Sequence, residues 1–195
     1  MGKVAGSRLQ VEVAVSTETE VKVKIEEAED FIGQLQTLKP EILSVRHFED
    51  NHLFDYPDGR LRACHCLIRV RYAQGECKLT FKGPPRAESV FKIREELETK
   101  LENGEILCRI FEKVGLRKWF RYQKYRREFQ LEGVTVAVDE TPIGDYVEFE
   151  GHEEKIYALA RKMRVDPDRF LKDSYYALYM QYCQQKNMVP GDMVF

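Results

Sequence analysis

The sequence has no long hydrophobic run, and its opposite charges nearly cancel. In 195 residues no apolar stretch is long enough for a membrane-spanning helix or a signal peptide, so we expect a cytoplasmic protein with no membrane partner. Lys and Arg number 31 against 33 Asp and Glu, a formal net charge of −2. This balance provides no overall field that would draw the chain to nucleic acid or acidic lipid.

The sequence also lacks a disulfide framework. Its five cysteines show no CxxC spacing, a pattern typical of reduced thiols. Cys64-His65-Cys66 is the one tempting metal-binding cluster. On a strand its two sulfurs would share a face and His65 would point away, and no second ligand pair occurs elsewhere, so we do not expect a zinc site.

What the sequence does have is alternation of polar and apolar residues, which predicts strands. The length fits a single domain, 1–195, with a core over about 11–180 and a tail over 186–195. Strands are expected over 11–27, 42–54, 66–72, 77–82, 90–100, 119–131, 134–141 and 145–150. Helices are expected over 27–39, 106–114, 152–163 and 167–185.

Several of these strands carry charges on one face and apolar residues on the other. A flat sheet with helices on its apolar face would leave the charged rows in water. A closed sheet would point them into a lumen, where a highly charged ligand would be needed to offset their repulsion and desolvation. The residues alone leave both arrangements open.

The charged rows contain the residue types that bind metal ions and phosphates. Glu18 and Glu20, two apart on one strand face, can reach one divalent cation such as Mg²⁺ or Mn²⁺, and Lys22 and Lys24 continue their row. Further cations suited to phosphate oxygens are Arg69, Arg71, Lys78, Lys82, Arg94, Lys124 and Arg126. Further carboxylates, for a second metal ion or for positioning these cations, are Glu96, Glu98, Asp139, Glu148 and Glu150.

Each element taken alone has a simpler interpretation. One Glu-x-Glu-x-Lys row is typical of a solvated strand face, and only its repetition favours a site. The basic and aromatic segment 117–127 resembles a nucleic-acid patch, but the neutral net charge and the flanking acidic strands argue against nucleic acid. The four histidines are expected to be structural or exposed, and the tyrosines of 174–179 to pack a helix.

The same blocks resemble the CYTH superfamily, the triphosphate tunnel metalloenzymes, which includes class IV adenylyl cyclases, thiamine triphosphatases and inorganic tripolyphosphatases. Glu18-Thr19-Glu20-Val21-Lys22 resembles the ExExK signature of this superfamily. The later blocks follow in the family's order: LIRVRY, LTFKGP, REELE, KYR and VDETPIGDYVEFEG. The ordered set spans about 11–179.

The resemblance implies an α+β fold, an eight-stranded antiparallel β-barrel with helices packed outside and a helical C-terminus. Its lumen would bind a triphosphate and one or two divalent metals, Mg²⁺ or Mn²⁺, and a homodimer is possible. Lys172 is the one candidate for a lysine that some thiamine triphosphatases carry on a C-terminal helix. The implied catalytic residues are Glu18, Glu20, Lys22 and Asp139, the last of which would lie near the metal or orient a basic group. The implied substrate-binding residues are Lys22, Arg69, Arg71, Lys82, Lys124 and Arg126, and the charged rows add Lys24, Lys78 and Arg94 as further candidates. The implied metal ligands are Glu18, Glu20 and either Glu148 or Glu150, and the charged rows add Glu96 and Glu98 as further candidate ligands.

Three functions remain on this basis. The first is metal-dependent hydrolysis of a triphosphate, either tripolyphosphate or thiamine triphosphate. The second is a class IV adenylyl cyclase that converts ATP to cyclic AMP and pyrophosphate; it would need a nucleoside pocket, for which Phe48, Phe54 and Tyr72 are candidates. The third is a polyphosphate- or nucleotide-binding module without turnover, which the presence of both Glu18 and Glu20 disfavours.

Overall fold

The protein is described by a computed structural model, which covers residues 16–87 and 89–195. The strands are β1 Ser16–Ile25, β2 Glu41–Asp55, β3 Leu67–Ala73, β4 Glu76–Lys82, β5 Lys92–Leu101, β6 Arg117–Leu131, β7 Val134–Thr141 and β8 Gly144–Gly151. The helices are α1 Ala28–Thr37, α2 Arg60–Ala63, α3 Gly104–Lys113, α4 Glu153–Lys162 and α5 Tyr175–Lys186, with a 3-10 turn at Pro167–Arg169.

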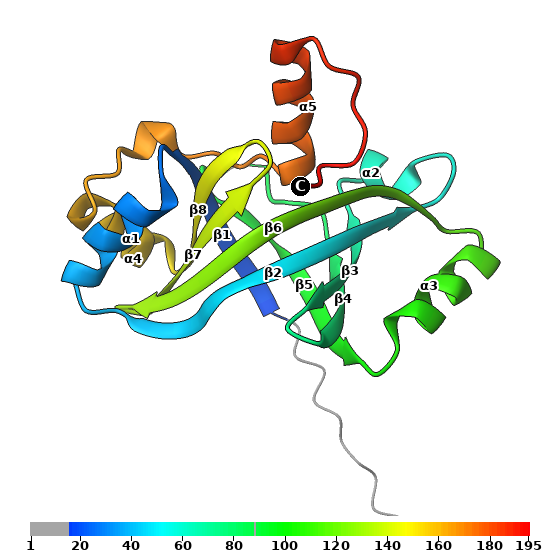
Figure 1. The fold of residues 1–195 in the computed structure, drawn as a ribbon, viewed down its shortest axis with the longest axis horizontal. Helices are drawn as coiled ribbons and strands as arrows, with labels where there is room; N and C mark the ends of the chain where they lie inside the picture. Colours follow the sequence, from blue (N-terminus) through cyan, green and yellow to red (C-terminus); the bar gives the residue numbers. More distant parts are fainter. Residues whose placement is uncertain (1–15, 88) are drawn as a thin grey trace, which may run out of the picture.

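The strands form a closed antiparallel barrel in the order β1-β5-β4-β3-β2-β6-β7-β8 (Figure 1). This confirms the closed alternative for the charged rows. Because side chains alternate across each strand, one row faces the lumen and the other faces the packed helices. Each predicted strand is present, although 11–15 lies outside the described residues.

The apolar rows are covered from outside by helices. α1 and α4 pack on β1, β7 and β8 around fully buried residues such as Leu35, Val147 and Leu159, and burial of each such side chain contributes about 1.5–3 kcal/mol. α3 packs on β3 and β4 through Leu107 and Phe111. The apolar core therefore lies between the barrel and its helices, and the charged rows line the inside of the barrel.

The helix predicted over 167–185 is wrong in its first half. After the turn at Pro167–Arg169 the chain is extended, and the backbone of Leu171 exchanges two hydrogen bonds with Lys22, with N···O distances of 3.0 and 2.8 Å. Leu171 occupies the edge of β1 beyond the last pair with β5. Only at Ser174, whose hydroxyl accepts from the Ala177 amide, does the helix begin.

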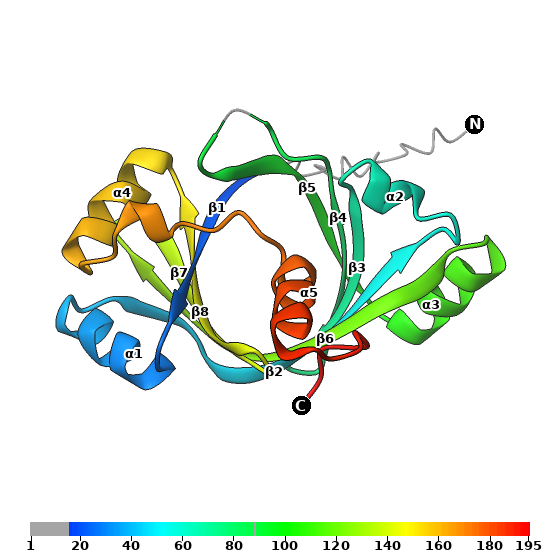
Figure 2. The ribbon, with the colours of Figure 1, turned by 90° about the horizontal axis from the view of Figure 1, so that it is seen from above.

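α5 stands in one opening of the barrel, as the view from above shows (Figure 2). Its inner side, with Tyr175 and Leu178, forms a second core with Phe120, Tyr122 and Tyr146 at the barrel end. One end of the lumen is therefore closed by aromatic side chains.

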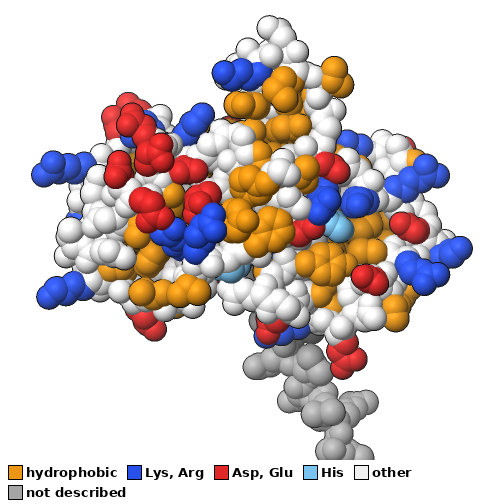
Figure 3. All heavy atoms as spheres, viewed as in Figure 1, with side chains coloured by type: hydrophobic (Ala, Val, Ile, Leu, Met, Phe, Trp, Pro, Cys, Tyr) orange, Lys and Arg blue, Asp and Glu red, His pale blue; other side chains and the backbone are white. Residues whose placement is uncertain are grey.

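The last residues, predicted as a tail, lie against the barrel. Met193 is 1% exposed, and its backbone pairs with Arg121 and Gln123 along the part of β6 that has no partner in β7. Phe195 reaches the ring of Tyr125. Hydrophobic side chains are gathered over β2, β6 and α5 on this face (Figure 3).

Candidate active site

The strand register brings the charged rows together inside the barrel. Glu18 lies opposite Arg94, Glu20 opposite both Lys92 and Glu150, and Lys22 opposite Glu148. The buried charged residues are Glu18, Glu20, Lys22, Glu49, Asp55, Arg69, Lys82, Lys92, Arg94, Lys124, Arg126 and Asp139. All except Asp55, which binds backbone amides of the 56–62 turn, belong to the lumen rows.

The two glutamates of β1 are held by cations from β4 and β5. Glu18 accepts from Lys82 Nζ at 2.5 Å and from Arg94 Nε at 3.1 Å, and Glu20 accepts from Lys92 Nζ at 3.0 Å. Burial would raise the pKa of Glu20, but the ammonium groups of Lys92 and Lys22 hold it below its usual value. Ion pairs therefore orient both carboxylates into the lumen, and Glu20 is ionised there.

Asp139 organises the opposite wall. This fully buried carboxylate accepts from Lys124 Nζ at 2.9 Å, from Arg126 Nε at 2.7 Å and from the Tyr175 hydroxyl at 2.5 Å. Arg126 also pairs with Glu148, which binds Lys22 Nζ at 2.7 Å. Asp139 therefore orients basic groups, one of the two roles that the resemblance implied for it.

The third wall lies on β2 and β3. Arg71 donates from Nε to Asn51 Oδ1 at 2.9 Å and lies 3.0 Å from Glu49. Arg69 donates to the Thr80 hydroxyl at 3.1 Å. Burial opposes the ionisation of Glu49, but Arg71 and Lys124 hold its pKa well below the usual range.

The six proposed metal ligands do not converge. In residues 16–87 and 89–195, no three acidic, histidine or cysteine side chains lie close enough together to hold a metal ion. Glu98 binds Lys78 at 2.8 Å, and Glu148 is engaged by Lys22 and Arg126.

Glu18, Glu20 and Glu150 nevertheless form an acidic region that suits a divalent cation. Partial burial and the carboxylates of Glu18 and Glu20 raise the pKa of Glu150 to about 7, although Lys82 opposes this. In the described part of the chain no basic side chain is within ion-pair distance of Glu150. Because Mg²⁺ commonly uses one or two carboxylates together with substrate phosphates and water, these residues fit such an ion.

Three predicted basic residues are less enclosed than the others. Lys24 is exposed, with its ammonium 6.0 Å from the centre of the Tyr146 ring, and Lys78 is 36% exposed. Lys172 is also exposed and donates to the Ser89 carbonyl at 2.8 Å. These three side chains lie at the rim or outside the buried cage.

Sequence analysis missed five lumen residues. Lys92 and Tyr122 lie two positions from Arg94 and Lys124, so strict alternation could have found them. Glu49 and Asn51 were obscured by irregular pairing of β2 with β6 between Ile42 and His47. Tyr175 was expected only to pack a helix; its ring does pack on Tyr122 and Tyr146, but its hydroxyl also reaches Asp139. The residues missed are Glu49, Asn51, Lys92, Tyr122 and Tyr175.

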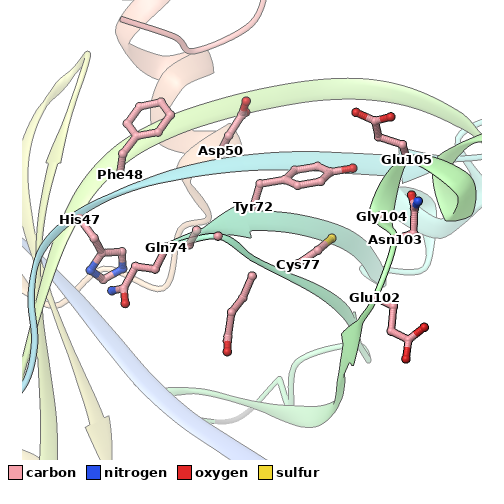
Figure 4. Close-up of a pocket in the computed structure, with 13 residues that line it drawn as sticks. His47, Phe48, Asp50, Tyr72, Gln74, Cys77, Glu102, Asn103, Gly104 and Glu105 are labelled. Carbon is pink, nitrogen blue, oxygen red and sulfur yellow. The ribbon is translucent and has the colours of Figure 1, made fainter.

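The three aromatic candidates for a nucleoside pocket face away from the lumen. Phe54 packs on Phe111 of α3, Tyr72 contacts Cys108 of α3, and Phe48 packs on Tyr125. Phe48 and Tyr72 instead line an outer groove of about 720 Å³ (Figure 4).

Comparisons with known proteins agree with this architecture. The family model described as the CYTH domain matches residues 16–166. A protein of Methanocaldococcus jannaschii named a "putative adenylate cyclase" is 26% identical over 165 residues, which cover 79% of this chain and 93% of that protein. The solved structure of a conserved hypothetical protein from Pyrococcus furiosus has a TM-score of 0.69 at 26% identity and covers 81% of this chain and 97% of that one.

A more distant structure adds support for the fold. It is that of HpAC1 from Hippeastrum, described as a "putative" adenylyl cyclase that reveals a dominant triphosphatase activity. It has a TM-score of 0.60 at 15% identity, covering 89% of this chain and 97% of that one.

The family match spans most of the chain and coincides with the barrel. The chain belongs to the CYTH domain family. Among the described residues, the helices are all too short or too polar to cross a membrane.

Proposed function

We propose that the protein is a triphosphatase that hydrolyses a small triphosphate, such as tripolyphosphate or thiamine triphosphate, inside the barrel. The observation that carries the proposal is the buried cage of cations, in which Lys22, Lys124 and Arg126 meet on one side of the lumen and Lys82, Lys92 and Arg94 on the other. A polyanion with many oxygen acceptors matches such a cage.

The chain's own residues would bind and orient the phosphate chain. Arg126 is held in place by Asp139 and Glu148, so its remaining donor directions are fixed before substrate enters. Lys22 and Lys124 would neutralise charge that develops on the transferred phosphoryl group. Preorganised cations of this kind act most strongly where water is excluded.

Glu18, Glu20 and Glu150 would hold the Mg²⁺ or Mn²⁺ ion. When bound, such an ion polarises phosphoryl oxygens and lowers the pKa of a coordinated water. Ion pairs hold Glu18 and Glu20 in the lumen, while Glu150 is free to exchange its proton for the cation.

A hydrolase is favoured over a cyclase because α5 fills one end of the lumen. Phe48, Phe54 and Tyr72 lie outside the barrel, so they offer no nucleoside pocket within it. The triphosphatase activity described for HpAC1 agrees with this preference. The alternative, a class IV adenylyl cyclase, is favoured by the name of the Methanocaldococcus jannaschii relative.

A product assay separates these functions. The purified protein is incubated with tripolyphosphate, thiamine triphosphate or ATP, each with Mg²⁺ and with Mn²⁺. Release of phosphate from either of the first two would support the triphosphatase. Cyclic AMP with stoichiometric pyrophosphate would establish the cyclase instead, and binding without product would favour a binding module.

A matched pair of lysine variants ties the activity to the lumen. Lys82→Met removes a buried cation from β4, whereas Lys100→Met removes one from an exposed ion pair with Glu76 on the neighbouring strand. We expect only Lys82→Met to lose activity, by roughly 10- to 100-fold, as for loss of one charged hydrogen bond. Equal activity of the two variants would place the reaction outside the lumen.

A further inference from the structure

Two buried hydrogen-bond donors on one wall of the lumen have no acceptor. They are Nδ2 of Asn51, whose side chain is fully buried, and Nε of Arg69, which is 7% exposed. Buried donors are almost always paired in folded proteins, because an unpaired donor forfeits its bonds to water. In the same two residues, Asn51 Oδ1 accepts from Arg71 and Arg69 Nη2 donates to the Thr80 hydroxyl.

The orientation of the Asn51 amide is fixed by its neighbour. Arg71 donates from Nε to Asn51 Oδ1 at 2.9 Å, so rotating the amide by 180° would place two donors against each other. Nδ2 must therefore point away from Arg71.

The two orphan donors are close neighbours in the sheet. Asn51 pairs with Arg71 and Leu53 pairs with Arg69, so Asn51 and Arg69 are diagonal neighbours on the lumen face, within reach of one ligand. Asn51 also lies opposite Tyr122 on β6. The ring of Tyr122 is 5.8 Å from that of Tyr175, so this wall adjoins the end of the lumen that α5 closes.

The surroundings favour an anion. Burial raises the pKa of Tyr122, but the cations of Arg69 and Lys124 lower it below its usual value, which is a sign of strong positive potential. The unpartnered acceptor on this wall is Glu49 Oε2, and the ammonium of Lys124 lies 3.5 Å from it. This wall therefore presents two unpaired hydrogen-bond donors next to several cations.

We propose that Asn51 is a substrate-contact residue whose amide nitrogen, together with Nε of Arg69, donates to a non-bridging phosphate oxygen at the α5-closed end of the lumen. The inference rests on the proposed triphosphate-binding function and adds to it a neutral contact. A phosphate oxygen only accepts hydrogen bonds, so it satisfies both donors at once. The phosphate chain would enter with one end against α5 and leave any organic group toward the opposite opening.

Substitution of Asn51 by Asp separates this role from a structural one. Asp keeps an oxygen for Arg71 but replaces the donor by an acceptor that repels phosphate. Asn51→Ala removes both groups. Gln36→Glu adds the same charge on the exposed face of α1 and serves as the control.

Binding is measured by calorimetry with the non-hydrolysable imido analogue of tripolyphosphate, and KM and kcat with tripolyphosphate. We expect Asn51→Asp to weaken binding by at least 10-fold, more than Asn51→Ala does, with Gln36→Glu unchanged. Arg69→Lys keeps the charge but lacks Nε, and it should weaken binding independently of whether the Asn51 variants fold.

The outcomes distinguish this inference from the proposed function. If the wild-type protein binds the analogue but Asn51→Asp and Arg69→Lys bind it equally well, the contact is absent and Asn51 only supports Arg71. If the wild-type protein binds no triphosphate, the proposed function fails and the inference fails with it.

Discussion

Glu20 and Glu150 face each other across β1 and β8, yet their carboxyl groups have opposite pKa shifts. Burial raises both values, but Glu20 has the ammonium of Lys92 at 3.0 Å, whereas Glu150 has Glu18 and Glu20 as its neighbours. Glu20 is the more deeply buried of the two and yet has the lower pKa, so the charged neighbours decide the direction of its shift. One carboxylate is permanently charged, and the other exchanges its proton near neutral pH.

Glu20→Gln tests the role of the permanent charge. Gln is nearly isosteric but is a poor ligand for Mg²⁺, so we expect metal-dependent phosphate release to fall at least 100-fold while the fold is retained. Phosphate release across a Mg²⁺ titration, with circular dichroism to verify folding, measures this. Wild-type turnover in the variant would remove Glu20 from the active site.

The raised pKa of Glu150 predicts a pH dependence of stability. Between about 4.5 and 7 the folded protein keeps a proton that the unfolded chain releases, so this group's contribution to stability is present below pH 4.5 and is lost as pH rises through 7. Although the carboxyl group is partly desolvated, much of the Glu150 side chain remains accessible to solvent, so screening limits the effect to about 1 kcal/mol or less.

Glu150→Gln should therefore gain stability relative to the wild type when the pH is raised from 4.5 to 8 in the presence of a chelator. Urea unfolding at the two pH values measures this difference. If the variant instead lost stability relative to the wild type over the same pH change, Glu150 would have a cationic partner in solution.

Residue by residue, alternation predicts the lumen rows well wherever a strand is regular. The ExExK row of β1 and the Arg rows of β3 follow directly from a two-residue period. The two-residue period does not predict which cation pairs with which carboxylate, because that depends on which strands are neighbours. Lys92, for example, lies beside Glu20 only because β1 pairs with β5. It also fails for Tyr175, which reaches the lumen from a helix.

At the scale of elements, α5 has the largest consequence for the site. Its local sequence favours a helix from Pro167 onward, but Leu171 gains two backbone hydrogen bonds with Lys22 by remaining extended. This tertiary pairing overrides the local pattern and places Tyr175 at the start of the helix, directly over the lumen. Neither the break nor its position could be predicted without knowing that β1 has a free edge there.

The hydrogen bond from Tyr175 of α5 to Asp139 should make a measurable contribution to the free energy of unfolding. Tyr175→Phe removes the hydroxyl that donates to Asp139 but keeps the ring between Lys22 and Lys124. We expect a loss of about 1.5 kcal/mol and a Tm about 3–6 °C lower.

Tyr182→Phe, on the same helix, is the control, because the Tyr182 hydroxyl has no hydrogen-bond partner among the described residues. Calorimetric Tm values of the two variants provide the test. Equal values would indicate that α5 leaves the lumen in solution.

At the scale of the whole molecule, the lumen buries charged side chains of both signs. Their burial costs free energy because these groups lose contact with water. Removing one partner of a buried pair leaves an uncompensated charge, so such networks are sensitive to substitution. The cations are paired with carboxylates, as Lys82 is with Glu18 and Arg126 with Asp139. A phosphate chain would compete for these cations and join several strands.

Ligand binding should therefore stabilise the whole barrel. At a tripolyphosphate concentration 100 times its Kd, the free energy of unfolding rises by about 2.7 kcal/mol, which corresponds to a Tm about 5–10 °C higher. Differential scanning fluorimetry with sulfate at equal ionic strength as the control measures it. An identical shift with sulfate would indicate general anion screening.

The closure of one end of the lumen by α5 also has a consequence for biosynthesis. The ribosome completes β8 before it makes α5, and β1 finds its partner β8 more than 100 residues later in the chain. Pairings of such long range form slowly. Since α5 follows β8 in the chain, it can cover the end of the lumen only after the residues of all eight strands have been synthesised.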